Sequence, residues 1–182
     1  MGKYNFKKND CFLLRNEDIN KPMTVYQIMD MSKKHIWAKS ISITNIMIHG
    51  MPIAHKYEKP IPEDALPLPT NSWQWAKKQM IAFVKEMNTY IRDNAVKGKS
   101  DPVIGGHYMD SRSNITTIKE INEDEIKYDL FKFDEDFISP YWTGSYRKDA
   151  TDEWYTISDS VYNEAIRRYN EFLLTIRKRF CK

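Results

Sequence analysis

The order of predicted strands and helices repeats along this chain, and that repeat constrains the fold more than any other feature of the sequence. In each half, three short segments rich in β-branched and aromatic residues precede one long segment with helical periodicity. Runs of strands followed by a helix are typical of α+β proteins. We therefore predict an α+β fold made of two units, each a small β-meander followed by an amphipathic helix.

Residue spacing supports an internal duplication. A trio of apolar residues recurs at a constant spacing of 90 positions, and a polar turn separates the last two members of each trio. The trios are Ile28, Met31 and Ile36 in the first half and Ile118, Ile121 and Ile126 in the second. The predicted helices begin 88 positions apart, at Trp73 and Val161. Few residues are identical, so two unrelated hairpins that share a common pattern are the alternative interpretation.

Six strands follow from the short apolar segments, three in each half. They are predicted at Asp10–Arg15, Met23–Met29 and Ile36–Ile43, and at His107–Met109, Ile115–Ile121 and Glu125–Phe131. The strand-turn-strand pattern resembles that of small SH3-like barrels. The resemblance implies a small barrel in each unit and no particular activity, because such barrels host many unrelated functions.

Two amphipathic helices are predicted, one from Trp73 to about Val96 and one that begins near Ser158 or Ser160. Asn71 and Gln74 have capping-box spacing, and Gly98 supplies a stop for the first helix. The apolar stripes consist of Trp73, Ala76, Met80, Phe83, Val84, Met87 and Ile91, and of Val161, Ala165, Tyr169, Phe172, Leu173, Ile176 and Phe180.

The repeat divides the chain into residues 1–98 and residues 99–182. Five prolines between positions 52 and 69 interrupt the first unit before its helix. Proline cannot donate a backbone hydrogen bond, so we predict that residues 52–69 form a stiff, extended connector. The two units thus differ in the segment that joins meander to helix.

Composition limits the classes of protein to consider. Hydrophobic residues make up 41% of the 182 positions, which suits a folded globule, and a net charge of +3 does not by itself indicate nucleic acid. No segment has the length and apolarity of a signal peptide or a membrane span, so we expect a cytoplasmic protein, or a virion protein if the source is a phage. Cys11 and Cys181 are expected to be reduced thiols.

Residues 139–148 form the most promising binding segment, because they combine Pro and Gly with the residue types that dominate binding hot spots. The predicted binding residues are Tyr141, Trp142, Tyr146, Arg147 and Lys148. The same rings could stack on unpaired bases while the cations contact phosphate. Alternatively, the segment folds back and its rings cap the second meander, since Trp154 and Tyr155 lie close by in the sequence.

Catalytic and metal sites have weaker support. His107, Asp110 and Ser111 are the residue types of a hydrolase triad, but a triad is defined by geometry. Asp134 and Asp136 could bind a divalent ion, although a solvated charge run explains them better. We expect no metal and no cofactor. The basic end of the second helix, with Glu164 and Glu171 placed to pair with Arg168 and Arg167, fits a solvated helix face.

These observations favour a non-enzymatic binding or structural protein that acts through protein–protein contacts, either with a protein partner or as a homo-oligomer. The Lys-, Asn- and Tyr-rich composition suggests a component of a phage-like assembly. Two alternatives stay open. One is a nucleic-acid-binding accessory protein that uses Trp142, Tyr146, Arg147 and the basic helix end. The other is a small hydrolase that uses His107 with Ser111 or Cys11.

Overall fold

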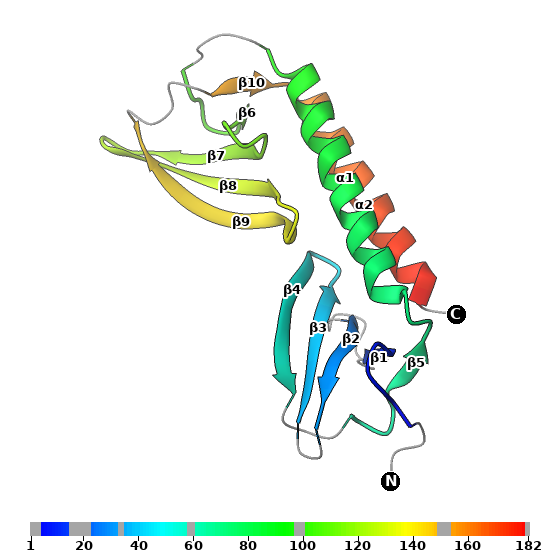
Figure 1. The fold of residues 1–182 in the computed structure, drawn as a ribbon. Helices are drawn as coiled ribbons and strands as arrows, with labels where there is room; N and C mark the ends of the chain where they lie inside the picture. The colour runs from blue at the N-terminus through cyan, green and yellow to red at the C-terminus, as the bar shows by residue number, and fades with distance from the viewer. Residues whose placement is uncertain are drawn as a thin grey trace. The chain divides into compact units, whose positions relative to one another are not determined.

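The fold is α+β, as the sequence predicts. The structure, a computed structural model, describes residues 5–14, 23–32, 35–57, 61–96, 101–148 and 154–180. These residues form ten strands and two long helices (Figure 1). The chain divides into two compact units: unit 1 comprises residues 1–81 and 175–182, and unit 2 comprises residues 82–174. Both helices contribute residues to both units.

Unit 1 contains five antiparallel strands in the order β5-β1-β2-β3-β4 (Figure 1). Their bounds are β1 Cys11–Leu14, β2 Met23–Met31, β3 Ile36–Ile43, β4 Ile48–Tyr57 and β5 Leu66–Leu68. The predicted meander corresponds to β1, β2 and β3. The predicted connector at residues 52–69 is wrong in part, because β4 includes Pro52 and β5 includes Pro67. Residues 58–60, within that connector, lie outside the described residues.

Unit 2 has the same strand order, β10-β6-β7-β8-β9, and its strands are also antiparallel. The bounds are β6 His107–Met109, β7 Ile115–Ile121, β8 Glu125–Phe133, β9 Phe137–Arg147 and β10 Tyr155–Ile157. The closed, SH3-like barrel expected for each unit is not confirmed. Among the described strands, the first and last in each order do not pair with each other, so each sheet is open.

The strand registers of the two sheets correspond in detail. Met31 pairs with Ile36 in unit 1, and Ile121 pairs with Ile126 in unit 2. The β2–β3 register shifts between Ile28 and Asp30, and the β7–β8 register shifts between Ile118 and Glu120. A β-bulge therefore interrupts both pairs at positions 90 residues apart.

A turn of the same kind precedes the first strand of each unit, β1 in unit 1 and β6 in unit 2. Asn9 and Gly105 both have a left-handed backbone, with φ of 73° and 82°. The amide of Asn9 donates to the carbonyl of Ile28 at 2.8 Å, and the amide of Gly105 donates to that of Ile118 at 2.9 Å. Asparagine and glycine are the residues that adopt this conformation most readily.

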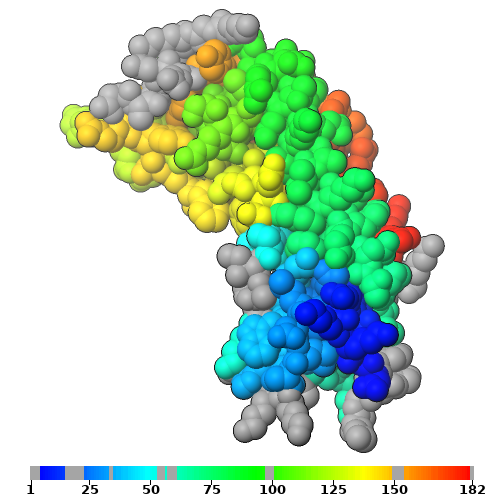
Figure 2. Space-filling model, viewed as in Figure 1, coloured from blue at the N-terminus to red at the C-terminus, as the bar shows by residue number. Residues whose placement is uncertain are grey.

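The helices are α1, Ser72–Asn94, and α2, Asp159–Phe180, close to the predicted bounds. They run antiparallel, because Trp75 contacts Phe180 in unit 1 and Phe83 stacks on Phe172 in unit 2, with ring centroids 5.9 Å and 4.2 Å apart. Mostly polar side chains occupy the exposed positions of α1, which lies at the surface (green in Figure 2). Gly98, the predicted stop, lies outside the described residues.

The start of α1 is fixed by contacts different from those predicted. The Gln74 side chain does not complete a capping box with Asn71; its Nε2 donates to Gln27 Oε1 on β2 at 2.8 Å. Gln27 Nε2 in turn donates to the carbonyl of Thr70 at 3.2 Å. This polar chain ties the first turn of α1 to the sheet of unit 1.

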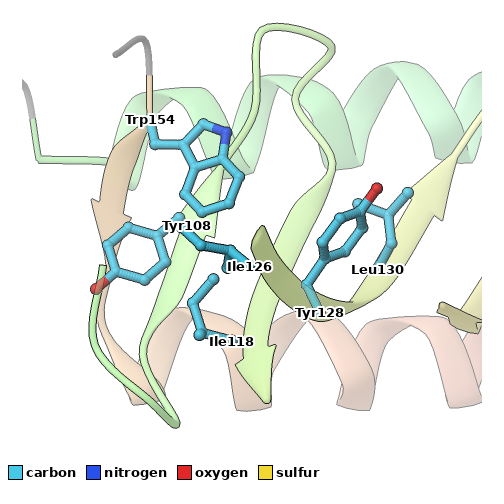
Figure 3. Packing of buried hydrophobic residues seen from close by; sticks show 6 residues of the cluster. All are labelled: Tyr108, Ile118, Ile126, Tyr128, Leu130 and Trp154. Carbon is cyan, nitrogen blue, oxygen red and sulfur yellow. The ribbon is translucent and has the colours of Figure 1, made fainter. Parts of the chain in front are cut away.

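Each sheet buries apolar side chains on both faces. In unit 2, Phe131 and Phe133 contact helix residues Tyr169 and Phe83. The opposite face of the sheet carries a cluster whose side chains gather in Figure 3, and its members are Tyr108, Ile118, Ile126, Tyr128, Leu130 and Trp154. Unit 1 has a corresponding cluster of Phe12, Ile28, Ile36, Ala38 and Ala65. In β8, Ile126, Tyr128 and Leu130 belong to the cluster of unit 2, whereas Phe131 and Phe133 point to the helices, so one strand supplies buried residues to both faces.

The described helices contain no stretch that is both long and apolar enough to cross a membrane.

Candidate binding surface on strand β9

The predicted binding segment is a strand and not a loop. Residues Phe137–Arg147 form β9, which pairs with β8 along most of its length. Proline in a strand normally costs a hydrogen bond, but the register shifts between the pairs Lys132–Ser139 and Leu130–Trp142. Pro140 therefore lies at a bulge, where its missing N–H removes no ladder bond.

Successive side chains of β9 point to opposite faces of the sheet, so the predicted binding residues are divided between the two faces. Trp142 pairs with Leu130 and Tyr146 pairs with Ile126, so both lie on the face that carries the apolar cluster of unit 2. Tyr141 and Arg147 lie on the other face. Lys148 follows the strand, and its amide donates to the carbonyl of Asp124 at 3.2 Å. The five residues therefore do not form one binding surface.

Tyr146 is partly buried and packs against the apolar cluster of unit 2. Its ring stacks on Tyr128 at 4.4 Å between centroids and meets Trp154 edge-on at 5.2 Å. Burial, together with a hydrogen bond that the Tyr146 hydroxyl donates to Tyr128, raises the pKa of Tyr146 far above its usual value. This matches the alternative in which the rings of the segment cap their own sheet.

Trp142 lies exposed on this face. Half of its surface is exposed, and its ring contacts Phe137 edge-on at 5.5 Å. Lys132 Nζ lies over both rings, 5.6 Å from the centroid of Trp142 and 5.8 Å from that of Phe137. We call these three residues the Trp142 patch. Sequence reasoning missed Phe137 and Lys132, because their link to Trp142 depends on the β8–β9 register.

The four arginines of α2 are engaged within their own units. Arg168 pairs with Glu164 at 2.7 Å and Arg167 pairs with Glu171, as predicted. Arg177 donates to Asn45 at 2.9 Å, and Arg179 lies 5.5 Å from the ring of Trp75. Arg177 and Arg179 belong to unit 1, whereas Trp142 belongs to unit 2.

The candidate triad is not assembled in the structure. His107 Nδ1 lies 2.7 Å from Thr117 Oγ1, its Nε2 lies 3.8 Å from Asp159, and its ring stacks on Tyr162. Asp110 instead accepts hydrogen bonds from its own loop, including the amide of Arg112 at 2.9 Å. Burial lowers the pKa of His107, and the Asp159 carboxylate offsets part of that shift.

Cys11 is the other nucleophile considered from the sequence. It is fully buried in unit 1, and its thiol donates to the carbonyl of Thr70 at 3.2 Å. Burial raises the pKa of the thiol. A buried thiol with a raised pKa is a poor nucleophile. Cys181 lies outside the described residues, and within the described chain no three His, Cys, Asp or Glu side chains gather as metal ligands would.

The candidate site is thus an exposed aromatic patch with one cation, on a sheet face whose remaining rings are packed into the core. Comparisons of the chain with protein-family models, with curated proteins and with solved structures found no match.

Proposed function

We propose that this chain is a non-enzymatic binding or structural protein, a component of a phage-like assembly, and that it binds a protein partner through the Trp142 patch. The observation that carries the proposal is the half-exposed Trp142 held between Phe137 and Lys132. Tryptophan is the residue most enriched at binding hot spots, where its loss typically costs about 2 kcal/mol or more. The contacts of its neighbours pre-organise the ring for a partner.

We further propose that the two units arose by duplication of one strand-and-helix unit, with halves at residues 1–98 and 99–182. The cross-strand pairing supports this proposal. Every residue pair of β6–β7 has a counterpart in β1–β2, and every residue pair of β7–β8 has a counterpart in β2–β3. The buried helix positions match as well, at a spacing of 89 residues. These pairs are Ala76 with Ala165, Met80 with Tyr169, Val84 with Leu173, Met87 with Ile176 and Ile91 with Phe180.

The correspondence ends in the last strand pair, and this difference supports a specialised role for β9. In unit 1 the β3–β4 register shifts between Ala38 and Ser40, whereas in unit 2 the β8–β9 register shifts closer to the hairpin. Pro52 in β4 and Trp142 in β9 lie the same number of residues beyond the β3–β4 and β8–β9 hairpins. In a duplicated scaffold, function is expected where the copies diverge.

The proposal is tested with the full chain and two matched variants. Trp142→Ala removes the centre of the patch, and Ile46→Ala removes a side chain that is exposed to the same extent in unit 1. Sedimentation velocity over a wide concentration range measures self-association, and affinity purification from the native host identifies other partners. We expect association that Trp142→Ala weakens at least about tenfold and that Ile46→Ala leaves unchanged.

Two results would contradict the proposal. One is a wild-type chain that is monomeric at every concentration and retains no partner. The other is association that both variants weaken equally, since general apolar exposure would then account for it. Binding to single-stranded DNA that falls steeply with salt and depends on Trp142 would instead favour the nucleic-acid alternative.

A further inference from the structure

Unit 2 contains a cavity of about 390 Å³ at the C-terminal end of α1. Three elements meet there: the last turn of α1, the end of β6 with its following loop, and the beginning of β10. The lining residues are Arg92, Ala95, Met109, Asp110, Ser111, Ser113 and Tyr155. The volume lies within the range of small-molecule sites, and the mixture of apolar side chains with a few polar groups is typical of them.

The loop that forms one wall is held rigidly. Asp110 Oδ1 accepts the amides of Arg112 and Asn114, both at 2.9 Å, and Oδ2 accepts Asn114 Nδ2 at 3.0 Å. Asn114 Oδ1 in turn accepts the amide of Phe133 on β8 at 2.9 Å. These bonds satisfy both oxygens of the Asp110 carboxylate within the loop.

Ser113 adopts a strained backbone at the cavity wall. Its φ is 62°, in the left-handed region that serine rarely occupies, and its side chain is buried. Arg92 Nη2 donates to Ser113 Oγ at 3.1 Å, and the amide of Ser113 donates to the carbonyl of Asp110. Strained residues persist where the surroundings hold them, which is common at ligand sites.

Arg92 brings a positive charge to the cavity wall. Its side chain donates to Ser113 Oγ, and among the described residues no carboxylate forms an ion pair with it. A guanidinium has five N–H donors in a planar fork that matches the oxygens of a carboxylate or phosphate. Most of these donors therefore stay available at the mouth of the cavity.

We infer that this cavity binds a small organic anion, with a carboxylate or phosphate group on Arg92. Ser111 and Tyr155 line the same cavity, and their side chains carry hydroxyl groups that can donate further hydrogen bonds. Met109 and Ala95 provide an apolar surface for the body of the ligand. This site is separate from the Trp142 patch and does not depend on the function proposed for that patch.

The test uses calorimetric titration of the full chain with benzoate, phenyl phosphate and the neutral analogue benzyl alcohol. We expect saturable binding of at least one anion and binding of benzyl alcohol that is at least about tenfold weaker, because it lacks the charge. Backbone NMR shifts should locate the anion at Ser111 and Ser113. A preference for benzoate or for phenyl phosphate identifies which of the two groups the site takes.

Arg92→Gln should weaken anion binding at least about tenfold. Arg112→Gln is the matched control, since it also removes one arginine charge, from the loop that follows β6, but at a residue outside the cavity lining. Tyr155→Phe keeps the Arg92–Ser113 bond and should weaken binding to a lesser degree, which covers the case in which Arg92→Gln does not fold. Equal loss in the two arginine variants, equal binding of benzyl alcohol, or no saturable binding of either anion would overturn the inference.

Discussion

Tyr128 illustrates how single side chains set the shape of unit 2. Its ring lies over Gly144 on the adjacent strand and stacks on Tyr146. A Cβ added at Gly144 would come within 2.7 Å of Tyr128 Cζ. Glycine is therefore required at this position because an aromatic ring covers the backbone, a pairing known to stabilise glycines in sheets.

Gly144→Ala should lower the free energy of unfolding by about 1–3 kcal/mol, the usual cost of an overpacked core. In a Tyr128→Val background the ring is absent, so the same change should cost much less. Urea denaturation of the two single variants and the double variant measures this difference. An equal cost for Gly144→Ala in both backgrounds would show that the ring is not the cause.

At the scale of elements, His107 links β6 to α2. Its ring stacks on Tyr162 at 3.9 Å between centroids, and one ring nitrogen contacts Thr117 on β7. Burial lowers the pKa of His107 below the ordinary value of 6.5. The folded chain therefore holds this imidazole in its neutral form at pH values where the unfolded chain would protonate it.

Stability should consequently fall as the pH decreases from about 6.5 toward the lower folded pKa of His107. The unfolded state binds more protons in that window, whereas above it the full stability is present. His107→Gln should reduce this dependence, and His35→Gln in unit 1 serves as the control. Urea denaturation at a series of pH values provides the measurement; identical pH profiles for His107→Gln and the wild type would contradict the assignment.

Secondary structure was predictable wherever side-chain periodicity was strong. Both helices, and the strands that include Ile36–Ile43 and Ile115–Ile121, match the apolar patterns. Strands β4 and β9 were missed because each contains proline and glycine, which usually indicate turns. In both strands the proline lies at a register shift, a position that only the cross-strand pairing reveals.

The candidate site was predictable only in part, for the same reason. The sequence indicates Trp142 by its residue type, but it does not show that the strand pairing packs Tyr146 against the apolar cluster and places Lys132 beside Trp142. The closed barrel, expected from strand pattern alone, was not confirmed. An open sheet of five short strands that buries apolar residues on both faces has the same sequence pattern as a small closed barrel.

At the scale of the whole molecule, unit 1 consists of two segments that are distant in sequence. Residues 175–182 complete a unit that otherwise comprises residues 1–81. Ile176 and Phe180 are buried there, and Phe180 contacts Trp75 at the beginning of α1. The core of unit 1 therefore depends on the end of α2.

A chain that ends at Leu174 should lose stability in unit 1, because removal of one large buried side chain typically costs about 2–5 kcal/mol. Hydrogen exchange should accelerate in β1 to β4, while a chain that ends at Phe180 should behave like the full chain. Amides of β2 and β3 that stay fully protected in the shorter chain would show that unit 1 folds without α2.

The discontinuity of unit 1 also affects the order of folding during synthesis. Domains generally fold as their residues emerge from the ribosome, N-terminal parts first. Here the sheet of unit 1 is synthesised first but lacks part of its core until residues 175–182 have been added, whereas unit 2 is one continuous segment. All residues of unit 2 are therefore synthesised before the last turns of α2, which complete unit 1, have been added.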